Sequence, residues 1–207
     1  MKKTLLISYT PRFESNTAKL VETYVQAAGK QSSMTHLDLV KEPPPLLLEE
    51  NLNALLKRNF MGLELTENES LAVKSTDQLV QKLLQAERLV IAFPMYNFSL
   101  PAAVKAWIDA VVQLGQTFKM TENGDYEGLC LGKRALILMT TGADFTQEPE
   151  KSMDYATLLI QTCLEFMGIE SHCITASGLN QYMDRTDEIV AEAQREIEVY
   201  LQEDKEW

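Results

Sequence analysis

The sequence has little cysteine and little histidine. The three cysteines, Cys130, Cys163 and Cys173, form neither a CxxC pair nor an even-numbered framework. We therefore expect neither disulfides nor a thiolate metal site. Buried or surface thiols are expected instead. With only His36 and His172, and with no GxSxG motif, no Ser-His-Asp hydrolase constellation is recognisable.

Long apolar runs and an excess of positive charge are also missing. No run approaches the roughly 20 apolar residues that cross a bilayer, and the apolar stretch after Lys2 and Lys3 is too short for a signal peptide. The net charge of −11 argues against nucleic acid and anionic membrane as partners, because both require a positive surface. We therefore expect a cytoplasmic protein.

Two nucleotide-binding signatures are absent, the GxGxxG of dinucleotide folds and the GxxxxGK[ST] of P-loops. An ordinary Rossmann dehydrogenase and a nucleotide hydrolase are thus disfavoured. What is present is an ordinary globular composition, 45% hydrophobic and 24% charged over 207 residues. This length predicts a single domain, residues 1–207.

Apolar segments with strand and helix periodicity alternate along the chain. The runs at 88–94 and 133–142 are unbroken, which is typical of parallel strands covered on both faces. Alternation of this kind predicts an α/β fold, a doubly wound five-stranded parallel sheet with helices on both faces. The expected strands are 3–7, 34–40, 88–94, 133–142 and 171–176, and the expected helices include 18–28, 102–112, 155–167 and 184–201.

Residues 41–87 form an extended connection. A proline stop is followed by an apolar periodic segment around 46–56 and then by an amphipathic helix in STDQLVQKLLQAER. Ser75 or Thr76 is the expected N-cap of that helix. We expect this connection to lie on one side of the sheet.

Ligands of an open α/β sheet bind at the carboxyl ends of the strands, so the loops after the first, third and fourth strands are the candidate site. In the first loop, Ser15, Asn16 and Thr17 coincide with a helix start, whose free N–H groups and dipole favour an anion such as a monophosphate. Arg12 and Lys19 would support an anion and Glu14 would oppose them. Taken alone, this loop is explained better by Ser15 as an N-cap.

The other two loops carry aromatic and small residues. PMYNFSLP, starting at Pro94, offers apolar contact for a planar ring and exposed backbone for its polar edge, although packing of its aromatic rings on the next helix explains the motif equally well. In TTGADF, Gly142 permits close backbone approach and two threonines add hydroxyl groups, although a simple turn is favoured for this loop alone. All three loops converge on one edge of the sheet.

Two phrases resemble a known family. PMYNF followed by a helix, and TFKMTENGDYEGLCLGKRALIL, are similar to the ring-binding loop and the hairpin-like connection of flavodoxin-like FMN-dependent NAD(P)H oxidoreductases, above all NADH-dependent azoreductases and quinone reductases. The resemblance is strong over residues 89–142. In the rest of the chain it rests on the order of the expected strands and helices. It implies an enzyme that moves two electrons from NADH or NADPH through flavin N5 to a quinone, azo compound or similar small-molecule acceptor.

The resemblance also implies roles for individual residues. The segment 15–17 would bind the FMN phosphate, 95–98 would line the ring with Asn97 near N5, and 140–143 would meet the pyrimidine side. Backbone N–H groups at 141–143 would stabilise charge on the reduced ring, without an essential acid or base. The active site would lie at a homodimer interface. The implied FMN-binding residues are Thr10, Ser15, Asn16, Thr17, Pro94, Met95, Tyr96, Asn97, Phe98, Thr140, Thr141, Gly142 and Ala143.

Some positions depart from the family. The spacing ahead of Ser15 differs, which leaves Ser8 and Thr10 open as phosphate contacts, and Ala143 stands where a second glycine is usual. Met120 replaces an aromatic residue on the substrate side of the flavin, so the range of acceptors stays open.

Two other functions compete with the reductase. The acidic surface suits a flavodoxin-type electron carrier that docks to basic redox proteins. A non-flavin interaction module is the third hypothesis, because a fold does not fix a function. The extended connection and the TENG phrase favour the reductase.

Overall fold

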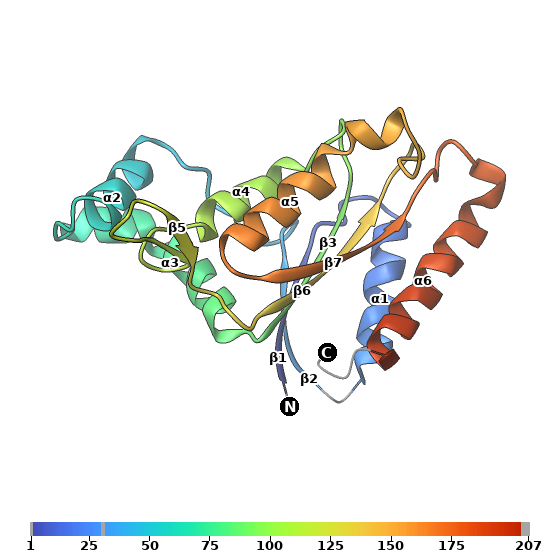
Figure 1. Cartoon of the computed structure of the whole chain (residues 1–207), viewed down its shortest axis with the longest axis horizontal. Helices are drawn as coiled ribbons and strands as arrows, with labels where there is room; N and C mark the ends of the chain where they lie inside the picture. The colour runs from blue at the N-terminus through green and yellow to red at the C-terminus, as the bar shows by residue number, and fades with distance from the viewer. Residues whose placement is uncertain (1, 30–31, 204–207) are drawn as a thin grey trace.

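The computed structural model describes residues 2–29 and 32–203, and its centre is a parallel sheet in the order β2-β1-β3-β6-β7 (Figure 1). The chain runs from β1 outward to β2 and returns to β3 on the other side of β1, which makes the space between β1 and β3 the topological switch point. The predicted doubly wound five-stranded sheet is confirmed. The strands are β1 (Lys2–Ser8), β2 (Ser32–Asp38), β3 (Arg88–Pro94), β6 (Arg134–Thr140) and β7 (Glu170–Ala176).

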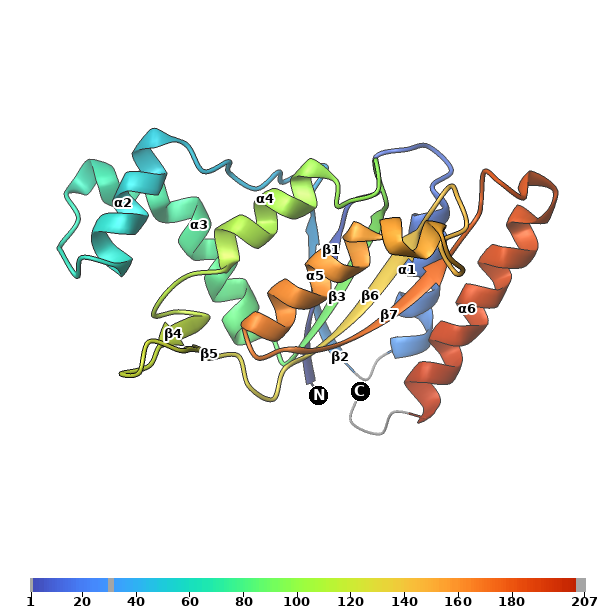
Figure 2. The same ribbon diagram turned by 45° about the horizontal axis from the view of Figure 1, so that its top comes forward.

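Helices cover both faces of the sheet (Figures 1 and 2). Helices α1 (Asn16–Ala28) and α6 (Thr186–Glu203) lie side by side on one face, while α3 (Glu67–Gln85), α4 (Ala102–Val111) and α5 (Tyr155–Phe166) cover the other. The strands supply both cores by alternation, since Leu5 and Ile7 of β1 pack toward α3 and α4, whereas Leu6 packs toward α1.

The extended connection contains two helices, α2 (Glu49–Asn59) and α3, which form the lobe at the left of Figure 1. The prediction that Ser75 or Thr76 caps the second helix is wrong. Thr66 caps it, because its side chain accepts the N–H of Glu69 while the Glu69 carboxylate accepts the N–H of Thr66. Thr76 lies fully buried within the helix.

The hairpin-like connection before β6 is an antiparallel pair, β4 (Phe118–Met120) and β5 (Tyr126–Gly128). The ring of Phe118 packs on Phe166 at the end of α5, with the ring centroids 4.7 Å apart. A Cβ at Gly128 would overlap the backbone of Met167 and Gly168, so only glycine allows this close approach. The hairpin is thereby fixed against the carboxyl end of α5.

Two strands end earlier in the structure than the sequence predicted. Strand β2 stops at Asp38 and not at Val40, because the Asp38 carboxylate accepts the N–H of Val40 at 3.0 Å and closes a turn. Strand β6 stops at Thr140, which leaves the next two residues in a loop. The cysteines are free thiols as expected, and no helix in the described part of the chain is long and apolar enough to cross a membrane.

Candidate functional site

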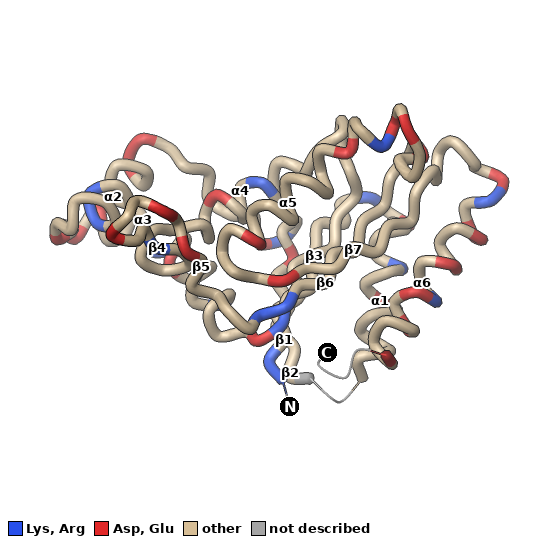
Figure 3. Tube along the Cα trace, viewed as in Figure 1, with Lys and Arg blue, Asp and Glu red and all other residues tan. Residues whose placement is uncertain are grey.

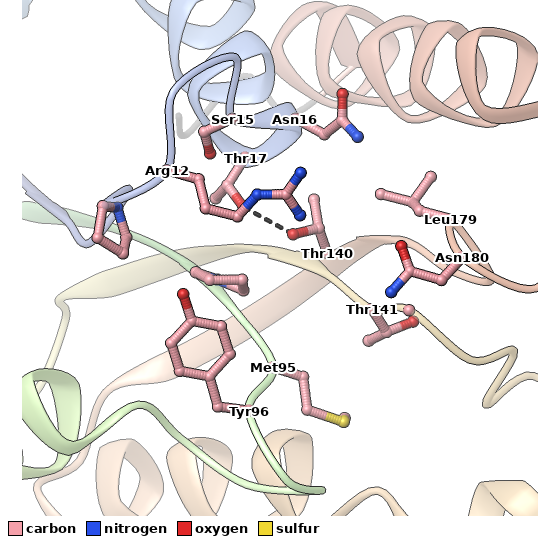
Figure 4. Close-up of a pocket in the computed structure, with 13 residues that line it drawn as sticks. Arg12, Ser15, Asn16, Thr17, Met95, Tyr96, Thr140, Thr141, Leu179 and Asn180 are labelled. Atoms are coloured by element: carbon pink, nitrogen blue, oxygen red, sulfur yellow. Dashed lines mark hydrogen bonds between the residues drawn. The ribbon is translucent and has the colours of Figure 1, made fainter. Parts of the chain in front are cut away.

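A cavity of about 190 Å³ lies at the carboxyl ends of the strands, next to the switch point (Figure 4). Loops after β1, β3, β6 and β7 form its walls, so one more loop contributes than the sequence indicated. The lining residues are Pro11, Arg12, Ser15, Asn16, Thr17, Pro94, Met95, Tyr96, Thr140, Thr141, Gly142, Leu179 and Asn180.

One end of the cavity is the start of α1. Ser15 is the N-cap, and its hydroxyl oxygen accepts the N–H of Ala18 at 3.3 Å. The N–H groups of Asn16 and Thr17 make no hydrogen bond with the described residues and belong to the first turn, where the helix dipole favours an anion. The capping explanation and the anion-site explanation are therefore compatible, because the cap uses the Ser15 oxygen and leaves these donors available.

A hydroxyl pair joins this helix to the sheet. The side-chain oxygens of Thr17 and Thr140 share a hydrogen bond of 2.6 Å, and both residues are buried (Figure 4). The hydroxyl of Thr141 donates to the carbonyl of Ala143 at 2.7 Å. The threonine hydroxyls that the sequence suggested as ligand donors thus hold the loops together.

Arg12 supplies the only formal charge among the lining residues. Its guanidinium extends into the cavity toward Thr17 and Thr140 (Figure 4), and it has no ion-pair partner within the described residues. Glu14, which the sequence suggested as an opposing charge, lies in the same loop but outside the lining, and other acidic residues lie along α6 (Figure 3). The wall of the cavity is therefore locally positive in a chain whose net charge is −11.

The loop after β3 turns tightly beside the cavity. The N–H of Tyr96 donates to the carbonyl of Ser99 at 3.1 Å, and the N–H of Ser99 donates back at 3.0 Å. Asn97 and Phe98 between them have positive φ angles of 48° and 67°, the conformation of a type I′ turn. Phenylalanine is unusual there and carries backbone strain, a feature that clusters at functional sites.

Aromatic contacts hold this turn on both sides. Tyr9 and Tyr96 pack edge to face with centroids 6.2 Å apart, and Phe98 packs in the same way on Phe145 at 6.2 Å. Burial raises the pKa of Tyr96, the neighbouring Tyr9 raises it further, and Arg12 lowers it. The Tyr96 hydroxyl therefore stays protonated at neutral pH and can donate a hydrogen bond.

The remaining wall comes from the loops after β6 and β7, which run side by side. The N–H of Leu179 donates to the carbonyl of Thr141 at 3.0 Å, and the N–H of Asn180 donates to the carbonyl of Gly142 at 2.9 Å. A Cβ at Gly142 would lie 2.7 Å from Asn180 Nδ2. The missing side chain at Gly142 lets these two loops and a ligand approach closely.

The structure brings most of the predicted site residues together. Those that line the cavity are Ser15, Asn16, Thr17, Pro94, Met95, Tyr96, Thr140, Thr141 and Gly142. Those that lie outside its lining are Thr10, Asn97, Phe98 and Ala143. The sequence did not decide whether Ser8 contacts the phosphate. In the structure its hydroxyl shares a hydrogen bond of 2.8 Å with the ring of His36 in β2.

Four lining residues were not among the predicted ligands: Pro11, Arg12, Leu179 and Asn180. Arg12 was weighed as a supporting charge, and its position beside a helix start was the available signal. Leu179 and Asn180 follow the last strand, whose carboxyl end also lies at this edge of the sheet. The parallel order of the strands could have pointed to that loop, since parallel strands end at the same edge.

The set of donors fits a phosphorylated planar molecule. A helix start, an arginine and an absence of lining carboxylates suit the phosphate, while Tyr96 and the close approach at Gly142 suit a ring. The described residues contain no group of three or more side chains that could hold a metal ion. These features match the FMN that the family resemblance implied.

Known proteins are similar to this chain in sequence and in fold. A family model described as a flavodoxin-like fold matches residues 2–201. "FMN-dependent NADH:quinone oxidoreductase 2" of Bacillus cereus is 34% identical over 203 residues, which covers 95% of this chain and 97% of the relative. An azoreductase from Bacillus anthracis str. Sterne has a TM-score of 0.89 at 27% identity, and the match covers 97% of this chain and 99% of that chain.

A second solved structure supports the fold alone. It is an FMN-dependent NADH-azoreductase from Bacillus anthracis str. Ames Ancestor in complex with FMN, with a TM-score of 0.85 at 23% identity over 98% of each chain. Fold and cavity thus define a doubly wound α/β protein with a cavity at the carboxyl ends of its strands. More specifically, the chain belongs to the flavodoxin-like fold family, and the resemblance stated from the sequence is confirmed.

Proposed function

We propose that this protein is an FMN-dependent oxidoreductase that transfers two electrons from NADH to a quinone, azo compound or similar small-molecule acceptor. One observation carries the proposal: a single cavity joins an anion site at the start of α1 to an aromatic and glycine-lined wall at the ends of β3 and β6. Relatives from Bacillus are named for the same reactions, quinone reduction and azo reduction.

Residues at the start of α1 bind the phosphate. The first-turn N–H groups of Asn16 and Thr17 have no other partner among the described residues, and Arg12 adds a full positive charge. Charge-assisted hydrogen bonds of this type are shorter and stronger than neutral ones. The phosphate therefore determines where FMN is anchored and distinguishes it from riboflavin.

Residues at the strand ends bind the ring. The Tyr96 turn gives an aromatic wall, and the N–H groups of Gly142 and Ala143 make no hydrogen bond with the described residues. The N–H of Thr141, which was also expected to stabilise charge on the ring, donates instead to the carbonyl of Ala176 at 3.0 Å. The two free N–H groups can stabilise negative charge at the polar edge of a ring that lies against them.

Bound FMN supplies the redox chemistry, so the protein needs to position reactants more than to move protons. The cavity lining contains no carboxylate and no histidine that could act as a general base. The protonated Tyr96 hydroxyl is one hydrogen-bond donor on the ring side.

A second copy of the chain completes the site. The cavity of about 190 Å³ is smaller than the roughly 300 Å³ or more of an ordinary ligand pocket, so one chain encloses only part of FMN and its substrate. Tyr96 and Phe98 remain exposed beside it, which leaves apolar surface for a partner to cover. We expect a cytoplasmic homodimer, tested by the mass of the FMN-loaded protein in solution.

The alternative function is a flavodoxin-type electron carrier without its own turnover. The acidic surface is compatible with it. The relative that this chain matches over nearly its full length, however, is named as an NADH:quinone oxidoreductase. The test is steady-state oxidation of NADH by the FMN-loaded protein with a quinone acceptor, repeated with NADPH and with an azo compound. Turnover with NADH supports the reductase, whereas retained FMN without any turnover supports the carrier.

A further inference from the structure

Asn180 follows β7 and was not among the residues implied to bind FMN. Its side chain extends into the cavity from the wall opposite Tyr96 (Figure 4). Its carboxamide makes no hydrogen bond with any described residue, although its backbone N–H donates to Gly142. A polar side chain in this position, with both its donor and its acceptor unused, is available to a ligand.

Hydrogen bonds fix the backbone at Asn180 beside the cavity. The N–H groups of Asn180 and Gln181 both donate to the carbonyl of Gly142, at 2.9 and 3.0 Å. The side chain of Gln181 accepts the N–H of Asp144 at 2.9 Å, and the Tyr182 hydroxyl donates to the Asp144 carboxylate at 3.3 Å. These bonds hold the loop after β7 against the loop after β6, and the Asn180 carboxamide lies next to Gly142.

The chemistry of the carboxamide matches one edge of a flavin. The pyrimidine edge of the isoalloxazine has an N–H donor flanked by two carbonyl acceptors, and a carboxamide carries one donor group and one acceptor. The free N–H groups of Gly142 and Ala143 lie in the adjoining loop. The side chain of Asn180 can therefore add one more hydrogen-bond donor to these two N–H groups.

We propose that Asn180 is a further cofactor-binding residue that hydrogen-bonds the pyrimidine edge of FMN and raises its reduction potential. The inference rests on the proposed function, because it requires FMN in the cavity. A donor at this edge favours the negative charge that reduction places there. An exposed loop asparagine that only meets water would affect neither FMN affinity nor potential.

The experiment compares two Asn180 variants with a control of the same residue type. Asn180→Leu removes the hydrogen bonds, and Asn180→Asp replaces the donor by a negative charge. Asn53 of α2 is also exposed, and its side chain has no hydrogen bond with the described residues, so Asn53→Asp adds the same charge away from the cavity. FMN affinity is measured by titration, and the potential by equilibration with a reference dye.

We expect Asn180→Leu to bind FMN roughly threefold to tenfold more weakly, as the loss of one hydrogen bond predicts. Asn180→Asp should bind it more weakly still and shift the potential to more negative values than Asn180→Leu does. The control should match the wild type in both measurements. Unfolding midpoints within a degree or two of the wild type exclude a general loss of structure.

Two results overturn the inference and remain distinguishable. If the wild type binds FMN and both Asn180 variants match the control in affinity and potential, the role of Asn180 is wrong while the proposed function stands. If the wild type itself does not bind FMN, the inference fails together with the proposed function.

Discussion

The two ends of the cavity are built in different ways. The phosphate end is local, since Arg12, Ser15, Asn16 and Thr17 lie within one turn-and-helix segment. The ring end is assembled from loops after three strands that are far apart in the sequence. The first end acts through charge and N–H groups, the second through shape and backbone spacing, so recognition of the phosphate and of the ring should be separable by mutation.

The largest effect should come from reversing the charge at the phosphate end. Arg12→Glu replaces the cation in the cavity by an anion, so we expect FMN affinity to fall about a hundredfold, while riboflavin affinity changes little. Titration with both flavins measures this difference. Lys19→Glu is the control, because Lys19 lies 3.9 Å from Asp187 and outside the cavity lining. Equal losses for FMN and riboflavin would contradict a separate phosphate end.

The hydrogen bond between Thr17 and Thr140 joins the two ends. Thr140→Val leaves the buried Thr17 hydroxyl without its partner, which should lower the free energy of unfolding by about 1–3 kcal/mol. The double variant Thr17→Val/Thr140→Val removes both polar groups and should regain part of this loss. Urea unfolding of Thr140→Val, Thr17→Val, the double variant and the wild type provides the measurement. Additive losses would show that the two hydroxyl groups are energetically independent.

Shortening the aromatic wall tests the ring end alone. Tyr96→Ala should weaken FMN and riboflavin by the same factor, up to about tenfold, because an aromatic contact contributes roughly 0.5–1.5 kcal/mol beyond burial. The double variant Tyr96→Ala/Asn97→Ala, which also disrupts the turn, should lose more. Tyr126→Ala on the hairpin serves as the control. Unchanged affinity in the double variant would remove this loop from the site.

The smallest effect on FMN binding is expected for Glu69, which lies outside both ends of the cavity. Hydrogen bonds from Lys57 and from the Thr66 backbone and side chain lower the pKa of Glu69 to about 2 from 4.5. This stabilisation is fully present above pH 4.5 and is lost as the pH falls toward 2. Glu69→Gln should therefore flatten the dependence of stability on pH across that window, with FMN affinity at neutral pH unchanged. An identical acid profile in the variant would refute the role of this carboxylate.

Local signals in the sequence predicted the parts of the fold that depend on neighbouring residues. The unbroken apolar run at 88–94 coincides with β3, and Ser15 is an N-cap because its side chain needs only the N–H three residues later. The start of α3 was missed because the amphipathic pattern is clearest after Ser75, whereas the capping box of Thr66 and Glu69 lies ahead of it. A cap can precede the apolar part of a helix by more than two turns.

The candidate site was only partly predictable for a related reason. Its loops were located from the rule that parallel strands share a carboxyl edge, but which side chains face the cavity depends on contacts between loops. The hydroxyl of Thr140 is hydrogen-bonded to that of Thr17, and the hydroxyl of Thr141 donates to the carbonyl of Ala143. Asn180 reaches the cavity because Gly142 has no side chain. Such pairings between distant residues have no signature in a single sequence.

The most direct test of the account is a titration of the full chain with FMN and with riboflavin. We predict one FMN bound per chain, at least a hundredfold more tightly than riboflavin, as expected when about 3 kcal/mol of binding comes from the phosphate end. A protein that stays colourless with FMN, or that binds both flavins equally, would contradict the account.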